Sequence, residues 1–233
     1  MKKIFCCLLL ILSFSAIMAQ AVGYECTYQE TMDLGDKLSQ IPDEASREAV
    51  KGFLSKRKSF YTLTYSQGQS LFAKNTDLSD DDMGMGYSMP VYFIDYARQE
   101  KTTQINFFGR NFIIIDTLDN ANWRITDETR TIAGHHCTKA EGDSNMVAWF
   151  SVETPIPAGP MSCYGLPGLV VELTVGPMTY TLTDIKPLQK VPIIKAPTKG
   201  KKITHAELQE IIKQKLSEMG FDGTHSGSIS IRM

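Results

Sequence analysis

The residues best suited to chemistry are three neighbours in the chain, His135, His136 and Cys137. Imidazole and thiolate side chains are good ligands for zinc or copper, and a cysteine beside a histidine can act as an activated nucleophile. Adjacent residues of a strand point to opposite faces, so the two histidines could not bind one metal ion from a strand. No second cluster of histidines and cysteines supplies further ligands. A turn after Gly134 that leads into a strand explains the triplet better than a metal site or a catalytic thiol.

A hydrolase would need a nucleophile paired with a base, and the sequence offers only a faint version of one. Ser162 and Cys163 precede Gly165, but the G-x-S-x-G spacing of a nucleophile elbow is absent. Pro160 also opposes the strand-to-helix turn that the elbow needs, and no carboxylates are clearly paired for acid–base work. We therefore expect no catalytic residues and no cofactor. A metal-binding protein that uses the triplet and a hydrolase are the second and third hypotheses.

Three cysteines follow the N-terminal apolar run, namely Cys26, Cys137 and Cys163. In an oxidising compartment, one disulfide is as reasonable an expectation as three buried thiols, and the sequence does not choose among the three pairs. If a bridge forms, Cys137 is its predicted member, because it belongs to a central strand region that both other cysteines could approach.

Residues 1–19 have the pattern of an export signal. Lys2 and Lys3 precede an apolar run that is too short to span a bilayer comfortably and that ends in small residues. Cleavage is predicted after Ala19 or after Ala21, and the alternative is an uncleaved anchor. No later stretch approaches a transmembrane length. We expect an exported protein that is either periplasmic or secreted, and association with the outer membrane is a further alternative. We expect no transmembrane segment in the mature chain.

The charge and length of the mature chain limit the classes of partner and the number of domains that we expect. Without the two signal lysines, 22 basic residues face 26 acidic ones, a net charge of −4 with no long basic run. This balance argues against nucleic acid and against anionic membrane as partners. The length of residues 20–233 suits a single domain.

Short segments with alternating polarity dominate the chain, and turn residues separate them. The first such segment places Cys26, Tyr28 and Glu30 on one face. Asp43 is a good N-cap for a short amphipathic helix, and Thr204 with Glu207 forms a capping box for a helix over 204–219. We predict a mostly β fold, a strongly bent antiparallel sheet or half-open barrel, with a short N-terminal helix and a C-terminal helix packed on it.

A stretch rich in proline and glycine, residues 155–168, joins two of the predicted strands. It also carries apolar side chains, so we interpret it as a rigid, packed connector, and the alternative is the lip of a ligand groove. The segment at its end, which runs into the next predicted strand, has a predicted role in maintaining the fold. Its two leucines are predicted to be buried. The residues of this structural motif are Gly165, Leu166, Pro167, Gly168 and Leu169.

Residues 165–170, Gly-Leu-Pro-Gly-Leu-Val, resemble the hallmark of the GLPGLI family, with Val170 in place of the final Ile. Segments 132–140, 148–150 and 155–160 are similar to further motifs of that family in the same order, with His135 at a usually aromatic position. The resemblance is firm from about residue 92 to 187. It implies a secreted or envelope protein of Bacteroidetes-type bacteria, with genes often near those of TonB-dependent receptors, and it assigns no reaction.

These observations favour a non-enzymatic, exported binding protein. The expected partner is a peptide, an apolar ligand or an outer-membrane protein, held on the concave side of the bent sheet. A TonB-dependent receptor enters this set by family association alone. A large apolar groove would support this hypothesis, whereas converging histidine and cysteine side chains would support a metal site.

Overall fold

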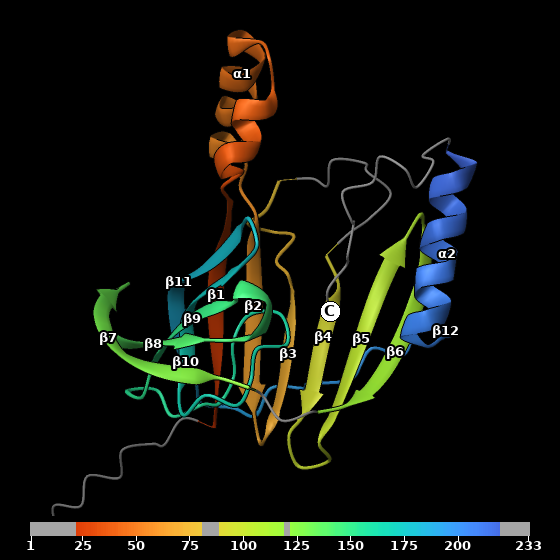
Figure 1. Cartoon of the computed structure of the whole chain (residues 1–233). Helices are drawn as coiled ribbons and strands as arrows, with labels where there is room; N and C mark the ends of the chain where they lie inside the picture. The colour runs from red at the N-terminus through yellow and green to blue at the C-terminus, as the bar shows by residue number, and fades with distance from the viewer. Residues whose placement is uncertain (1–21, 81–88, 119–121, 220–233) are drawn as a thin grey trace, which may run out of the picture.

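The computed structural model describes residues 22–80, 89–118 and 122–219. Two α-helices and two short 3-10 helices accompany the strands (Figure 1). The helices are η1 (Gly35–Gln40), α1 (Glu44–Lys56), η2 (Asp143–Asn145) and α2 (His205–Glu218). The strands are β1 (Gly23–Met32), β2 (Phe60–Ser66), β3 (Gln69–Lys74), β4 (Val91–Asp95), β5 (Glu100–Phe107), β6 (Arg110–Thr117), β7 (Arg124–Ile132), β8 (His135–Glu141), β9 (Val147–Ser151), β10 (Leu169–Val175), β11 (Met178–Leu188) and β12 (Lys201–Lys202).

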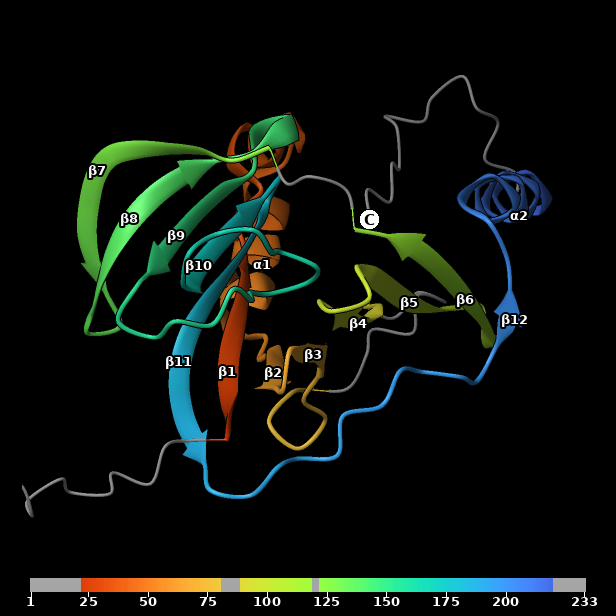
Figure 2. The same cartoon turned by 90° about the horizontal axis from the view of Figure 1, so that it is seen from below.

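The twelve described strands form one sheet in the order β12-β6-β5-β4-β3-β2-β1-β11-β10-β9-β8-β7. Strands β2 to β6 make one antiparallel meander and β7 to β11 a second, and β1 joins the two by pairing with both β2 and β11. Among the strands that the structure describes, only the two-residue β12 pairs in parallel, with β6. Figure 2 shows the sheet bent into an open trough. The predicted mostly β fold with a strongly bent antiparallel sheet is confirmed.

One face of the sheet, here called the inner face, carries the apolar core across most strands. Directly paired residues of neighbouring strands share a face, and the pairs Tyr28–Tyr61 and Phe72–Tyr92 place their rings on this one. Each of these four rings is buried. The same row continues through Thr103 of β5 and Ile114 of β6. The inner face therefore reaches from β1 to the β6 edge, where α2 lies.

The helix α2 packs on the inner face at that edge. Its capping box is formed as predicted, with the Glu207 backbone N–H donating to Thr204 Oγ1 at 3.2 Å and the Thr204 N–H donating to Glu207 Oε2 at 2.7 Å. Leu208 and Ile212 are buried against side chains of β5 and β6, including Ile105. The predicted C-terminal helix on the sheet is confirmed.

The helix α1 begins as predicted but stands away from the sheet. The Asp43 carboxylate accepts a hydrogen bond from the Ser46 backbone N–H at 2.7 Å, which caps the helix. No residue of α1 is buried, and Phe53 is 50% exposed. Figure 1 shows the helix projecting beyond the ends of β1 and β2. Helix α1 therefore does not pack on the core, although its sequence has the apolar periodicity of a packed helix. In the part of the chain that is described, no helix has the length and apolar composition to cross a bilayer.

Candidate ligand-binding site

The triplet His135, His136 and Cys137 lies at the start of β8 and does not converge. His136 is exposed and Cys137 is fully buried, as expected for neighbours on opposite faces of a strand. His135 is half-buried, with its Nδ1 3.3 Å from the Glu153 carboxylate. Among the described residues, no group of three histidine, cysteine or acidic side chains could hold a metal ion. The hypothesis of a metal site at this triplet finds no geometric support.

All three described cysteines are free and buried. Of the two expectations from the sequence, one disulfide or three buried thiols, the structure has the second. The predicted disulfide at Cys137 is not formed. Burial raises the pKa of the Cys137 thiol to about 11, and that of Cys26 and Cys163 to about 12. The thiolate is the nucleophile and the metal ligand, so thiols that remain protonated at neutral pH suit neither role. They act here as small apolar side chains.

These raised thiol pKa values predict a loss of stability in alkali. Above about pH 9, the unfolded chain releases the Cys163 proton while the folded protein still holds it, so the free energy of unfolding falls as pH rises. The expected slope is about 1.4 kcal/mol per pH unit for this thiol. Urea unfolding of the wild type and Cys163→Ala between about pH 9 and about pH 11 measures it. Equal slopes for the two proteins would contradict the prediction.

The connector between β9 and β10, residues 152–168, covers the inner face at its centre (Figure 2). Ile156 and Ala158 belong to the same core cluster as Tyr28 and Tyr61. The buried Tyr28 hydroxyl donates to the Val170 carbonyl, just after the connector, at 2.6 Å. The chain itself therefore fills the concave side of the central strands where the connector covers it.

The glycine–leucine motif lies inside this packed region. Leu166 is 2% exposed and Leu169 is fully buried, whereas Pro167 is exposed. Gly165 has φ +86°, in the left-handed region that favours glycine. Gly168 has no such angle, but a Cβ there would lie 2.1 Å from the Ser151 carbonyl oxygen. The burial of both leucines and the backbone requirements of both glycines are those of a motif that maintains the fold.

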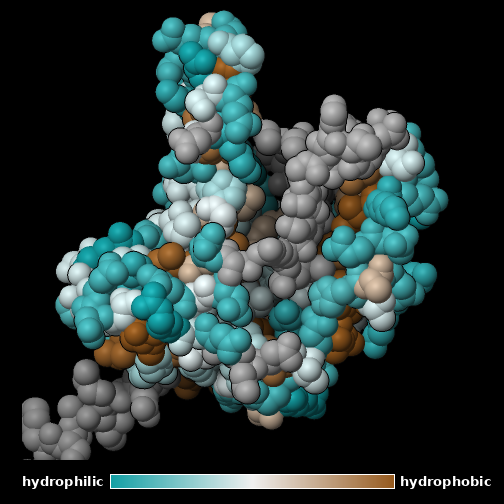
Figure 3. Space-filling view, in the orientation of Figure 1, coloured by the Kyte–Doolittle hydropathy of each residue, from teal (hydrophilic) through white to brown (hydrophobic). Residues whose placement is uncertain are grey.

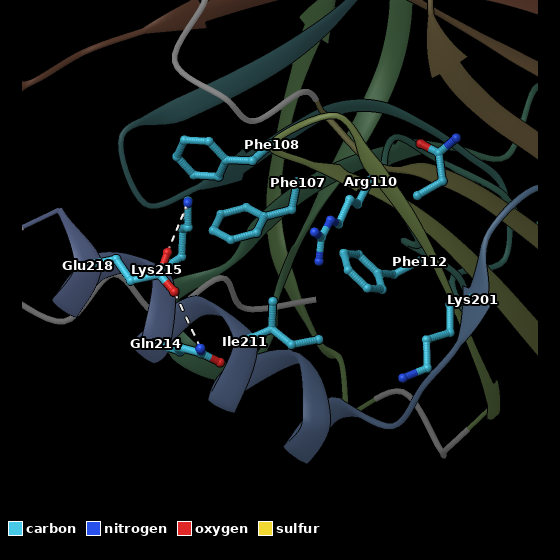
Figure 4. A pocket seen from close by; sticks show the side chains of 10 residues that line it. Phe107, Phe108, Arg110, Phe112, Lys201, Ile211, Gln214, Lys215 and Glu218 are labelled. Atoms are coloured by element: carbon cyan, nitrogen blue, oxygen red, sulfur yellow. Dashed lines mark hydrogen bonds and ion pairs between the residues drawn. The ribbon is translucent and has the colours of Figure 1, made fainter.

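A cavity of about 710 Å³ opens at the other end of the inner face, between the β5–β6 hairpin and the second half of α2 (Figure 4). Its volume lies within the usual range for small-molecule sites. Hydrophobic surface follows the seam beside α2 in Figure 3. The lining residues are Phe107, Phe108, Arg110, Asn111 and Phe112 of the hairpin, Lys201 of β12, and Ile211, Gln214, Lys215 and Glu218 of α2.

The strand register explains why the hairpin presents these side chains together. Phe107 pairs with Arg110, and Ile105 pairs with Phe112, so all four side chains share the inner face. Lys201 pairs with Phe112 across the parallel β12–β6 contact. Phe107 and Phe112 are 8% and 5% exposed and form an aromatic floor. Figure 4 shows Phe107, Arg110 and Phe112 directed toward α2.

Phe108 occupies a strained position at the mouth of the cavity. It has φ +48° in the two-residue turn Phe108-Gly109, and Gly109 has φ +75°. Such turns favour Asn-Gly, because a bulky residue in the left-handed region is strained. The ring is 40% exposed, stands edge-on to Phe107 at 4.8 Å between centroids, and has Lys215 Nζ 5.5 Å from its centre. Gln67-Gly68 and Ala133-Gly134 have similar positive φ angles, so the strain at Phe108 comes from the turn type.

The charges at the cavity are unequal, with three cations and one carboxylate among the lining residues. Lys215 Nζ lies 3.0 Å from Glu218 Oε2, so these two neutralise each other. The pKa of Glu218 is lowered, first by the hydrogen bond from Lys215 and less by the charge of Arg110. Within the described ranges, the side chains of Arg110 and Lys201 form neither a hydrogen bond nor an ion pair. The pKa of Glu207 is lowered, first by hydrogen bonds from Thr204 and less by the charge of Lys201.

The sequence interpretation did not identify this cavity. Its lining comes from segments about a hundred residues apart, and the periodicity of each segment shows only that it has an apolar face. One local signal was present. A two-residue connection that reads Phe-Gly between alternating strands places a bulky side chain where Asn is usual.

No protein-family profile and no curated protein matches the chain. Solved structures of PNGF-II in two space groups do resemble it. The structure in P21 has a TM-score of 0.55 at 16% identity over 83% of this chain, and the one in C2 has a TM-score of 0.54 at 15% identity over 82%. The chain spans about one third of PNGF-II, 34% and 33% of the two chains. At this identity the likeness shows the fold alone.

Proposed function

We propose that this chain is a non-enzymatic, exported binding protein whose cavity between the β5–β6 hairpin and α2 takes a small apolar ligand. The observation that carries the proposal is the preformed cavity of about 710 Å³ over the buried rings of Phe107 and Phe112. Ile211 faces these rings from α2, so the floor is apolar on both sides (Figure 4). Around this apolar floor the lining is polar and charged, and small-molecule sites commonly join an apolar surface to polar groups that orient the ligand.

The chemistry of the lining favours binding over catalysis. The titratable groups that it contributes are Arg110, Lys201, Lys215 and Glu218, and none is a nucleophile with an adjacent base. Lys215 and Glu218 are paired with each other. A small ligand also fits the space better than a folded partner does, because the chain itself fills the central inner face and leaves a bounded cavity at its end.

Export and membership of the GLPGLI family belong to the same proposal. The family-like segment 165–170 joins the end of the packed connector to the start of β10, which agrees with a motif kept for the fold. Both predicted cleavage positions precede Val22, whose backbone N–H donates to the Leu188 carbonyl at 2.9 Å. Either cut would leave β1 whole. Sequencing the N-terminus of protein from the cell envelope tests export, and a chain that still begins at Met1 would contradict it.

Binding can be tested with a neutral fluorescent probe, N-phenylnaphthylamine, and two matched variants. Phe108→Asn and Gln67→Asn each place Asn before Gly in a two-residue turn whose first residue has positive φ, but only Phe108 lines the cavity. Both variants should unfold at the wild-type urea concentration or higher, because Asn tolerates the left-handed region. Only Phe108→Asn should weaken probe binding, by roughly fivefold, which is about the worth of one aromatic contact.

The outcome that would overturn the proposal is equally specific. If the wild type shows no saturable fluorescence increase with the probe, and no heat of binding with octanol, the cavity is not a ligand site. Equal weakening of probe binding by Phe108→Asn and Gln67→Asn would place the probe elsewhere and have the same consequence.

A further inference from the structure

Resting on the proposed binding function, we infer that the ligand of this cavity is a small organic carboxylate with an apolar body. Its head group is held by Arg110, with Lys201 nearby, and its body lies over Phe107 and Phe112. The inference combines two features of the lining that are separate in origin. One is the aromatic floor, and the other is the pair of cations, Arg110 and Lys201, which form no ion pair with a described acidic side chain.

The register places the cation beside the floor. Arg110 is the cross-strand partner of Phe107 and lies two residues before Phe112, so the three side chains leave the sheet on the same side. Lys201 pairs with Phe112 from the other neighbouring strand. A ligand body resting on both rings therefore has a guanidinium and an ammonium group at its margin, as Figure 4 shows for these labelled side chains.

The charge of the lining selects the sign of the head group. Aromatic floors also suit organic cations, but Arg110 and Lys201 would repel a cation, and the charges of Lys215 and Glu218 offset each other. A neutral ligand of the same shape would fill the floor and leave Arg110 without a partner. A carboxylate matches the planar, forked donors of a guanidinium group and can accept two hydrogen bonds from it.

Octanoate and octanol provide matched ligands that differ in the head group alone. Each is titrated at neutral pH against the full-length protein loaded with N-phenylnaphthylamine, and displacement of the probe is recorded. Octanoate should displace the probe from the wild type at a concentration roughly tenfold or more below that of octanol, as expected for a charge-assisted hydrogen bond. In Arg110→Met, this preference should fall to about onefold while octanol still displaces the probe.

Lys213→Met is the control for net charge. Lys213 is an exposed residue of α2 that does not line the cavity, so its loss changes the overall charge equally and should leave the preference for octanoate unchanged. Arg110→Lys should give an intermediate preference, because an ammonium group keeps the charge but not the fork.

The outcomes separate this inference from the binding function beneath it. Equal displacement by octanoate and octanol in the wild type would overturn the carboxylate and leave an apolar binding site. An unchanged preference in Arg110→Met, or an equal loss in Lys213→Met, would also overturn it. Absence of binding by the probe and by both competitors would overturn the binding function itself.

Discussion

Replacing Gly168 with alanine is expected to destabilise the protein by about 3 kcal/mol or more, enough to unfold a typical domain in part. The added Cβ would lie 2.1 Å from the Ser151 carbonyl oxygen, 2.7 Å from the Ser151 carbonyl carbon and 3.0 Å from Val152 Cα. These atoms are backbone at the end of β9, and Ser151 pairs with Leu169 in the sheet. The clash can be relieved only by moving strands that the core holds, which is costly. Urea unfolding followed by circular dichroism measures the change.

Gly52→Ala is the matched control for this variant. Gly52 lies inside α1, and a Cβ there would have no neighbour within 4 Å. Alanine is the better helix former, so this variant should be more stable than the wild type by about 0.5–1 kcal/mol. If Gly168→Ala unfolds at the same urea concentration as the wild type, the close packing at Ser151 is wrong.

Leu166→Ala is expected to cost roughly 2–5 kcal/mol, as a large-to-small change in a core. Leu166 is 2% exposed and packs in a cluster with Phe150, Cys163 and Val170. Its truncation would leave a void beneath the connector that neighbouring strands can fill only in part. Binding of the naphthylamine probe should persist wherever the variant remains folded, because Leu166 does not line the cavity.

Val152→Ala tests whether burial causes this loss. Val152 begins the same connector but is 64% exposed, so its truncation should change the free energy of unfolding by less than about 0.5 kcal/mol. If Leu166→Ala lowers ligand binding and leaves stability unchanged, the motif is a recognition site and its structural interpretation fails.

The sheet could be predicted from sequence where each strand carries its own signal. Apolar residues predict one strand over Arg110–Thr117, after the turn residue Gly109, and another over Leu169–Val175. Strands β6 and β10 have these bounds. One difference is β7, which the sequence divides into two segments around the polar residues Asp127 and Glu128. In the structure it is one strand whose register shifts between Ile125 and Thr129. The polar residues of β7 interrupt the alternation of the sequence but not the strand, because the register shift accommodates extra residues of β7 opposite β8.

Two other features could not follow from local pattern. Residues 186–202 are rich in Pro and Lys, which predicts an extended connector. The segment contributes the end of β11 and both residues of β12, and such short parallel pairing depends on where the sheet edge lies. The cavity likewise depends on α2 meeting the β5–β6 hairpin. Ile211 and Phe112 each show an apolar face in the sequence, but the space between them exists only after both elements have docked.

The position of β1 has a consequence for how the chain folds. This first strand lies at the centre of the sheet, and its partner β11 comes much later, with Gly23 opposite Leu188 and Met32 opposite Met178. Pairings between distant segments form slowly, because a long loop must close before any contact is gained. Until they form, β1 and β11 are each the unpaired edge of a meander, and such edges invite pairing with other chains. We expect the seam between β1 and β11 to close last. The speed at which the two meanders meet then decides between folding and aggregation.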